Sequence, residues 1–361
     1  MRHALELARR GRGDVEPNPM VGCVIVSGGQ IIAQGHHAIF GGPHAEAAAL
    51  AACTASPRGA TAYVTLEPCC HTGKKNPPCV PLLIAANLAR IVVACEDPNP
   101  RVAGSGIRQL RDAGLSVDVG VADKEARQLN AAFFARQLFA RPYVTLKWAQ
   151  TADGKIAGPG GKPVKISCAA SFKVIHALRA KSDAILVGIG TALSDNPLLT
   201  PRPPHPRRRP LRIVIDRENQ LPPDSRLAKS SAEFPLHVYN RDNTPLDSAG
   251  HLCLPAILSD LHQRGVTHLL VEPGPRLAAG FLRQNLADRL WLFRAPNRMN
   301  DDTAPAAITV PFPPIAATEI DGDLLTEHLN PQSDVFYASC ASADFLATEV
   351  LATDGAKNFT E

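Results

Sequence analysis

Apolar residues in the first 140 positions follow two alternating patterns. Short apolar runs are typical of strands, whereas longer segments with an apolar residue at every third or fourth position are typical of helices. The tripeptide Ser27-Gly28-Gly29 separates two of the runs and indicates a hairpin between them. The predicted strands are residues 21–26, 30–35, 62–66, 90–95 and 116–119, and the predicted helices are residues 2–11, 44–53, 80–87, 102–113 and 124–139.

The alternation restarts after Arg141-Pro142, where proline disfavours continuation of a helix. Further predicted strands are residues 143–149, 184–188, 211–215, 236–239, 268–271 and 290–295, and further helices are residues 170–180, 256–264 and 276–284. After Arg298 the pattern fades into a polar, proline-rich segment, and we predict no further element. Strands that alternate with helices predict mainly parallel or mixed sheets with helices on their faces. We therefore expect an α/β protein of two domains, residues 1–140 and 141–361.

Composition agrees with a two-domain soluble protein. The chain has 361 residues, of which 45% are hydrophobic and 20% are charged. The net charge of +4 and the aromatic content of 5% are too low to indicate a nucleic-acid binder. The run Arg207-Arg208-Arg209 is expected to be a solvated loop, with a nearby phosphate-bearing substrate as the alternative.

The nine cysteines favour a reducing compartment, because their number is odd and they lie singly in apolar runs or near a histidine motif. No apolar run approaches the roughly 18 residues that a membrane span needs. The amphipathic N-terminus lacks the apolar core of a signal peptide. We expect a cytoplasmic protein with no membrane partner.

His44, Cys69 and Cys79 form the most informative pattern in the chain. One imidazole and two thiolates can hold three corners of a zinc tetrahedron and leave the fourth to water. Glu46 follows the histidine by two positions, as in the H-x-E signature of the zinc deaminases of nucleobases, and would shuttle the protons of that water. The start of a predicted helix at Cys79 is expected to lower the pKa of its thiol.

Two alternatives remain at this site. Cys70 lies next to Cys69 and could be the ligand in its place, although the rigid Glu67-Pro68 step favours Cys69. A closed structural site would need a fourth protein ligand, and Cys70 or His71 could supply it.

With their neighbours, these residues resemble the bifunctional riboflavin-biosynthesis family, in which a pyrimidine deaminase is fused to a reductase. The matching motifs are Pro17-Asn18-Pro19, Val21-Gly22-Cys23, Pro43-His44-Ala45-Glu46, Thr65-Leu66-Glu67-Pro68-Cys69, Asp97-Pro98-Asn99-Pro100, Val102-Ala103-Gly104-Ser105-Gly106, Leu146-Lys147, Asp153-Gly154-Lys155, Leu178-Arg179-Ala180, Gly188-Ile189-Gly190-Thr191, Asp195-Asn196-Pro197-Leu198-Leu199-Thr200 with Arg202, and Val271-Glu272. The resemblance runs from about residue 2 to 295, and the second half diverges after about residue 296.

The resemblance implies a cytidine-deaminase-like three-layer domain followed by a dihydrofolate-reductase-like α/β domain. It implies deamination of a ribosylated diaminopyrimidinone phosphate, reduction of the ribose by NADPH, and assembly into dimers or tetramers. It also implies zinc ligands at His44, Cys69 and Cys79, with Glu46 as the proton shuttle. In the second half it implies NADPH contacts at Ala149, Thr191, Asp195 and Gly274 to Gly280, and substrate contacts at Arg179, Leu199, Arg202 and Glu272. The residue types support part of this, because arginines are suited to phosphate and a helix begins after Gly274, but no G-x-G-x-x-G motif follows a strand to support dinucleotide binding.

Several positions depart from the family's pattern. The loop between the two cysteine ligands is one residue longer and carries Lys74-Lys75-Asn76, and Cys70 restores the usual spacing to Cys79. In the second half the departures are Pro163, Lys165, Pro273 and Asn297. Proline cannot adopt the positive φ open to glycine, so Pro273 predicts a turn that is rebuilt or lost.

The departures leave the activity of the second half open. A deaminase with a degenerate, structural reductase-like domain therefore stands beside the bifunctional enzyme. A nucleic-acid-editing deaminase and a zinc-stabilised binding module without catalysis are the remaining alternatives.

Overall fold

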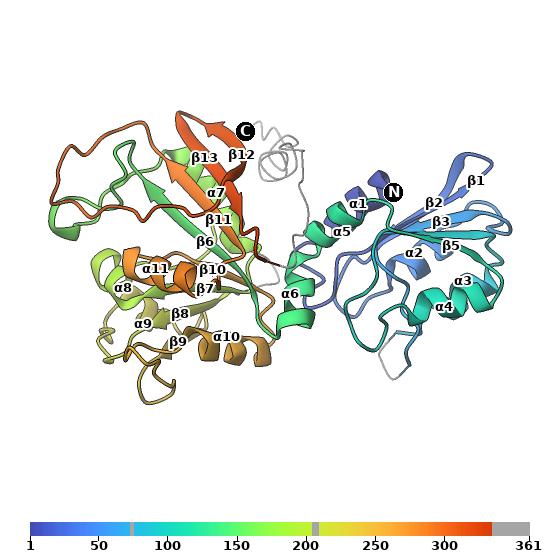
Figure 1. Ribbon diagram of the computed structural model, residues 1–361, viewed down its shortest axis with the longest axis horizontal. Helices are drawn as coiled ribbons and strands as arrows, with labels where there is room; N and C mark the ends of the chain where they lie inside the picture. Colours follow the sequence, from blue (N-terminus) through green and yellow to red (C-terminus); the bar gives the residue numbers. More distant parts are fainter. Residues whose placement is uncertain (73–75, 204–208, 334–361) are drawn as a thin grey trace. The chain divides into compact units, whose positions relative to one another are not determined.

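A computed structural model of the chain describes residues 1–72, 76–203 and 209–333. The chain divides into two compact units, Met1–Ala140 and Arg141–Glu361, each of which is described here by itself (Figure 1). The basic residues Lys74, Lys75, Arg207 and Arg208 lie outside the described residues. Within the described part of the chain, no helix is long and apolar enough to cross a membrane.

The first unit is built on a five-stranded sheet with the order β2-β1-β3-β4-β5. β1 is antiparallel to both of its neighbours, whereas β3, β4 and β5 are parallel. The strands are β1 (Gly22–Ser27), β2 (Gln30–His36), β3 (Thr61–Val64), β4 (Arg90–Val93) and β5 (Ser116–Val119). The helices are α1 (Arg2–Arg9), α2 (Ala45–Ala51), α3 (Cys79–Ala85), α4 (Ser105–Asp112), α5 (Asp123–Leu129) and α6 (Ala131–Phe139).

Helices cover both faces of this sheet and make three layers (Figure 1). α1 packs on the face that carries Val24, and α2, α3 and α4 pack on the opposite face with Cys23 and Ile25. The approach of α2 to β2 is very close, because a Cβ at Gly35 would meet the backbone nitrogen of Ala49 at 2.4 Å. Glycine at this position therefore lets the helix that follows His44 lie directly on the sheet.

The second unit is built on an eight-stranded sheet with the order β12-β13-β11-β6-β10-β7-β8-β9. The six strands from β11 to β9 in this order are parallel, and β13 and β12 extend the sheet as an antiparallel hairpin. The strands are β6 (Tyr143–Gln150), β7 (Ala184–Gly188), β8 (Leu211–Ile215), β9 (Leu236–Tyr239), β10 (His268–Val271), β11 (Arg289–Arg294), β12 (Pro314–Ile320) and β13 (Asp323–Leu329). The helices are η1 (Pro159–Gly161, 3₁₀), α7 (Ala169–Ala180), α8 (Ile189–Asp195), α9 (Arg226–Lys229), α10 (Leu254–Gln263) and α11 (Pro275–Arg283).

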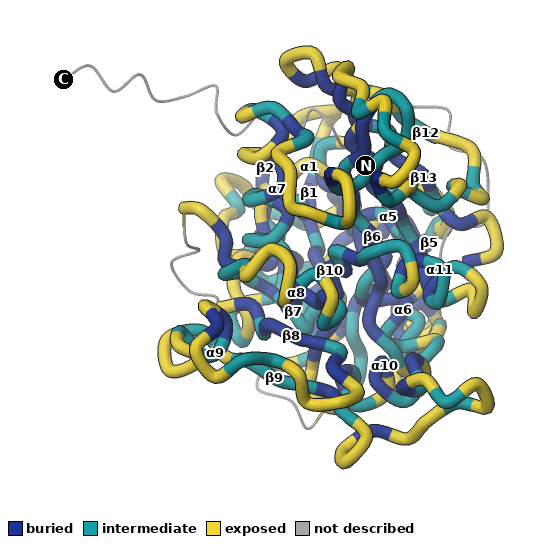
Figure 2. Tube along the Cα trace, turned by 90° about the vertical axis from the view of Figure 1, so that its left-hand side faces the viewer, coloured by how far each residue is buried: buried dark blue, intermediate teal, exposed yellow. Residues whose placement is uncertain are grey.

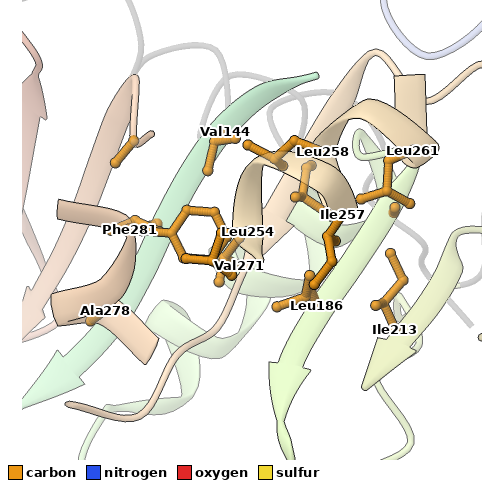
Figure 3. Close-up of a cluster of buried hydrophobic side chains, with 14 of the residues drawn as sticks. Val144, Leu186, Ile213, Leu254, Ile257, Leu258, Leu261, Val271, Ala278 and Phe281 are labelled. Atoms are coloured by element: carbon orange, nitrogen blue, oxygen red, sulfur yellow. The ribbon is translucent and has the colours of Figure 1, made fainter. Parts of the chain in front are cut away.

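The core of this unit has two halves, one on each face of the sheet. Figure 3 shows α10 and α11 packing Leu258 and Phe281 over strand residues such as Val144 and Leu186. On the other face α7 packs against residues of β7, β8 and β10. Strands buried on both faces are mainly apolar in sequence, which is why β7, β8 and β10 are recognisable despite Arg212 in β8 and are largely buried (Figure 2).

The structure corrects three predictions about the elements. The single helix predicted for residues 124–139 is broken at Asn130, whose side chain accepts from the Met20 N–H (2.8 Å) and donates to the Met20 carbonyl (2.9 Å). The short helices α8 and α9 were not predicted. The prediction that no strand follows Arg298 is wrong, because β12 and β13 form a hairpin there. The sequence feature that could have predicted this hairpin is Asp321-Gly322. Their positive φ values of 47° and 86° suit a tight hairpin turn.

Candidate active sites

The first site joins three residues that lie far apart in the sequence. His44 precedes α2 as its N-cap, Cys79 is the first residue of α3, and Cys69 lies in the loop after β3. Each cysteine Sγ is 3.4 Å from the Nδ1 atom of His44, and one ligand atom from each residue lies within 4.8 Å of the others. This is the one potential metal-binding cluster in the described part of the chain.

Backbone hydrogen bonds hold the two cysteines in register. The N–H groups of Cys79 and Val80 both donate to the carbonyl of Cys69, at 2.9 and 3.2 Å, so the first turn of α3 is attached to the loop that carries Cys69. Cys70 does not belong to the cluster but packs at the edge of the apolar core, and His71 does not belong to it either. The geometry therefore brings together Cys69, not Cys70, with the other two donors.

The donor set fits a zinc ion, because one imidazole nitrogen and two sulfurs converge and leave room for a fourth ligand. The thiol of Cys79 does not have the lowered pKa that its helix position predicts. A hydrogen bond with Cys69, followed by burial, raises its pKa. Two adjacent buried sulfurs resist sharing two negative charges, and a dication between them removes that penalty.

Glu46 is buried in the first turn of α2 and faces the same cluster. Burial, and after it the neighbouring charge of Cys69, raises the pKa of its carboxyl group to about 7. A group that is half protonated near neutral pH is well suited to accept and return a proton.

His37 and Asn18 complete the surroundings of His44, and neither was predicted as a site residue. The rings of His37 and His44 meet edge to face with centroids 5.4 Å apart. The Nδ1 atom of His37 lies 2.8 Å from the Pro43 carbonyl, which can only accept, so this nitrogen carries the proton. Its Nε2 atom then accepts from the Asn18 amide at 3.1 Å. In the sequence, the Pro17-Asn18-Pro19 motif was the feature that could have indicated Asn18 as a site residue.

Glu67 holds a loop beside the cysteine ligands. Its buried carboxylate accepts from four backbone N–H groups at 2.9 to 3.3 Å, those of Asp97, Gly104, Gly106 and Ile107. Gly106 lies so close that a Cβ there would meet the Pro68 carbonyl at 2.2 Å. The carboxylate thus replaces a capping side chain at the start of α4 and fixes the peptide that leads to Cys69.

We predict that Glu67→Gln destabilises the first unit. The amide nitrogen of glutamine would face backbone donors and lose the charge-assisted bonds, at a cost of about 2–4 kcal/mol. Urea denaturation and zinc content measure the change. Asp118→Asn is the matched control, because Asp118 forms an exposed pair with Arg90 and its loss is expected to cost less than about 1 kcal/mol. Equal effects of the two substitutions would contradict the clamping role of Glu67.

The second site lies at the carboxyl ends of the parallel strands, where ligands bind in open α/β sheets. Glu272 directly follows β10, and Ala149 lies near the end of β6. Arg179 of α7 contacts Glu272 in a bidentate ion pair, with Nε–Oε1 and Nη2–Oε2 distances of 2.6 and 2.9 Å. Two of the predicted substrate residues are therefore brought together, and much of their polar surface is engaged with each other.

Lys147 of β6 belongs to the same cluster and was not predicted as a site residue. Burial lowers the pKa of its amine, although the charge of Glu272 opposes that shift. Burial alone would raise the pKa of Glu272, but Arg179 and Lys147 outweigh it and hold the pKa at about 2. The cluster is thus a buried carboxylate between two cations.

The N-termini of α8 and α11 lie beside this cluster. A Cβ at Gly274, the N-cap of α11, would be 3.7 Å from the Oγ1 atom of Thr191 in α8. The first turns of both helices contain no acidic residue, so their N–H groups suit a phosphate. NADPH, a dinucleotide phosphate, fits this arrangement.

The structure changes the expectation about the turn after Glu272. Neither Pro273 nor Gly274 has a positive φ, and Gly274 is extended at φ −75° and ψ 174°. Proline is compatible with this path, so Pro273 causes no backbone strain here. Gly280 lies within α11, not in a turn, and its Cα faces Leu254 of α10.

The other predicted residues of the second site are placed as follows. Asp195 ends α8. Leu199 is buried, and its side chain belongs to the core on the α7 face. Arg202 is exposed, and its charge lowers the pKa of His176 after the larger effects of burial and Arg179. The unusual residues Pro163, Lys165 and Asn297 are all exposed.

A metal-binding cluster on a three-layer deaminase fold, followed by an α/β domain with a cluster of Arg179, Lys147 and Glu272 near helix N-termini, defines a zinc-dependent deaminase joined to a reductase. Residues 1–95 match the family described as the cytidine and deoxycytidylate deaminase zinc-binding region, and residues 142–304 match the RibD C-terminal domain. The chain belongs to the RibD family of bifunctional riboflavin biosynthesis proteins.

Individual relatives cover most of the chain. It is 40% identical to the riboflavin biosynthesis protein RibD of Aquifex aeolicus over 311 residues, which cover 83% of this chain and 87% of that protein. It is 39% identical to RibD of Escherichia coli over 324 residues, covering 84% and 88%. Among solved structures, Acinetobacter baumannii RibD matches with a TM-score of 0.80 at 33% identity, covering 91% of this chain and 97% of that one. The deaminase/reductase of Thermotoga maritima matches with a TM-score of 0.77 at 34% identity and the same coverage.

These matches confirm the predicted family, the two-part α/β fold and the bifunctional deaminase and reductase activity. The cofactors are zinc for the first domain and NADPH for the second. The alternative of a deaminase with a purely structural second domain is not favoured.

Proposed function

We propose that the first domain removes an amino group from 2,5-diamino-6-ribosylamino-4(3H)-pyrimidinone 5′-phosphate, and that the second reduces the ribosyl group of the product to ribityl with NADPH. The observation that carries the deaminase half is the convergence of His44, Cys69 and Cys79 beside the buried carboxyl of Glu46. The family membership supports the order of the two reactions.

In the deaminase domain, His44, Cys69 and Cys79 hold the zinc ion. When bound, zinc supplies Lewis-acid activation of the attacking water. Glu46 would accept one proton from that water and pass it to the ring nitrogen, and would then carry the second proton, from the added hydroxyl group, to the amino group that leaves as ammonia. His37 keeps the His44 ring in place through their edge-to-face contact.

We predict that Cys69→Ser abolishes zinc binding and that Cys70→Ser does not. Cys69 Sγ lies in the donor cluster, whereas Cys70 packs against the apolar core. Metal content by mass spectrometry of the purified proteins, together with deaminase activity, measures the difference. Full zinc occupancy in Cys69→Ser together with loss in Cys70→Ser would reverse the assignment.

In the reductase domain, Thr191 and Gly274 bind NADPH at the adjoining N-terminal ends of α8 and α11, next to Ala149 of β6, and Asp195 binds it from the C-terminal end of α8. Gly280 contributes to the packing of α11 rather than touching the cofactor. Arg179, Glu272, Arg202 and the backbone of Leu199 position the pyrimidine substrate. NADPH supplies the hydride, and the buried ammonium of Lys147 is suited to hold the proton that the reduction also consumes.

A coupled assay tests the proposal. The diaminopyrimidinone phosphate is supplied with and without NADPH, and both products are followed by chromatography. We expect the deaminated intermediate to accumulate without NADPH and to be converted to the ribityl product with it. Accumulation of the intermediate despite NADPH would remove the reductase from the proposal and leave the deaminase.

We also infer a homo-oligomer, a dimer or tetramer, and no nucleic-acid partner. The family resemblance supports the first inference. The net charge of +4 and the aromatic content of 5% support the second. Light scattering after size-exclusion chromatography gives the mass in solution, and a purely monomeric protein would contradict the first.

A further inference from the structure

Arg212 is a wholly buried arginine in the middle of the second unit. It belongs to β8, and its side chain is fully excluded from solvent. The Nη1 atom donates to the carbonyl of Leu198 (3.2 Å) and the Oγ atom of Ser230 (2.7 Å), and Nη2 donates to the carbonyls of Leu227 (3.1 Å) and Phe234 (2.5 Å). All four acceptors are neutral. A buried guanidinium held by neutral oxygens is costly, which calls for a reason beyond packing.

The segment that contains Leu198 is unusual in its backbone. Asn196 and Leu199 both have positive φ, at 40° and 53°. This region is strained for a leucine and persists only where the surroundings impose it. Such strain is found where a site is held in a set shape before its ligand arrives.

Three contacts hold the backbone of residues 196–200 in this conformation, one at the start, one in the middle and one at the end. At its start, the Oδ1 atom of Asn196 accepts from the Arg226 N–H at 2.8 Å. In the middle, Arg212 binds the Leu198 carbonyl. At its end, the Thr200 backbone lies beside the His176 ring, whose pKa it helps to raise against the larger lowering by burial and Arg179.

The direction of the Leu198 carbonyl determines the direction of the Leu199 N–H. The Leu198–Leu199 peptide is not among the cis bonds, and in a planar trans peptide the carbonyl and the N–H point to opposite sides. Because the Leu198 carbonyl points to Arg212 in the interior, the Leu199 N–H points away from it. That N–H donates to no acceptor among the residues that the structure describes.

We propose that Arg212 is a positioning residue of the reductase, which turns the Leu198–Leu199 peptide so that the Leu199 N–H can donate to the pyrimidine substrate. The inference rests on the proposed function, in which the Leu199 backbone meets the substrate. Arg212 itself touches no substrate. The side chain of Leu199, packed in the core, anchors the other side of the same peptide.

The test compares Arg212→Lys with Ser230→Ala. Lysine keeps the charge but loses the fork that binds several oxygens at once. Ser230→Ala removes one acceptor of the same guanidinium and leaves the Leu198 contact, so it controls for lost stability. We measure reductase kcat and KM for the deaminated pyrimidine, the Kd of that pyrimidine by calorimetry, the Kd of NADPH by fluorescence, and the Tm.

We expect Arg212→Lys to lower kcat/KM for the pyrimidine by about 10- to 100-fold, mainly through KM. The pyrimidine Kd should rise in parallel and the NADPH Kd should change less than about twofold, a factor worth under about 0.5 kcal/mol. Ser230→Ala should leave both Kd values and kcat/KM unchanged even if its Tm falls. A lower Tm in Arg212→Lys with unchanged pyrimidine KM and Kd would overturn the inference, because it would make the residue merely structural.

Asn196→Gly keeps the test decisive if Arg212→Lys does not fold. Glycine tolerates the positive φ at this position but removes the contact with Arg226. A pyrimidine KM raised several-fold in this variant supports a substrate role for the held segment, and an unchanged KM overturns it. The unmodified protein distinguishes failure of the proposed function from failure of the inference about Arg212. If it neither binds the pyrimidine nor oxidises NADPH, both fail. If it turns over normally and Arg212→Lys is unaffected, only the inference fails.

Discussion

Glu46→Gln is expected to lower deamination by about 10²- to 10⁴-fold while zinc stays bound. Glutamine has nearly the same volume as glutamate and cannot accept a proton, whereas the three metal donors of the cluster are untouched. Single-turnover conversion of the diaminopyrimidinone phosphate measures the chemical step, and metal analysis measures occupancy.

The same chain provides a control for this substitution. The reductase of Glu46→Gln, assayed with deaminated substrate and NADPH, should equal that of the unmodified protein. Glu6→Gln changes an exposed carboxylate on α1 and should leave both activities unchanged. Full deaminase activity in Glu46→Gln would show that another group moves the proton.

Glu272→Gln is expected to have the largest effect on the reductase. The carboxylate lies between Arg179 and Lys147, and its loss leaves two half-buried cations without their main counter-charge. Breaking a buried pair in this way costs about 3–5 kcal/mol. We expect reductase kcat/KM to fall by about 10²-fold or more, because Arg179 also loses its orientation. NADPH oxidation with supplied deaminated substrate measures the loss, and deamination should not change.

This substitution also changes the dependence of the remaining reductase activity on pH. Burial already lowers the pKa of Lys147, and the charge of Glu272 partly opposes that shift. Without the carboxylate the pKa falls further, so the ammonium is lost at a lower pH. The alkaline limb of the kcat profile should therefore move to lower pH, and a shift to higher pH would contradict the role of Lys147.

Glu327→Gln separates the loss of stability from the loss of function. Glu327 pairs with Arg289 in another buried ion pair, at the start of β11 and hence at the opposite end of the parallel strands. It should lower the Tm as Glu272→Gln does, but the folded fraction should keep its reductase kcat/KM. Equal losses of activity in both variants would point to stability alone.

Local patterns sufficed for much of the fold. The parallel strands β7, β8 and β10 are buried on both faces and therefore appear as mainly apolar segments in the sequence, although β8 contains Arg212. The β12–β13 hairpin was missed because it follows a long proline-rich stretch and mixes polar with apolar residues. The break at Asn130 was missed because the reason for it, a pair of hydrogen bonds to Met20, lies 110 positions away in the chain.

The sequence by itself indicated the family and the two kinds of chemistry, with His44, Cys79 and one of two neighbouring cysteines as the metal donors and Glu46 as the proton shuttle. Only the tertiary structure decided which of Cys69 and Cys70 joins the cluster, because two adjacent cysteines are the same residue type and differ only in the direction of their side chains. It also showed that Pro273 needs no positive φ, that Lys147 lies near Glu272 and Arg179, and that Arg212 binds the Leu198 carbonyl. These depend on contacts between distant strands and loops, which local sequence patterns do not contain.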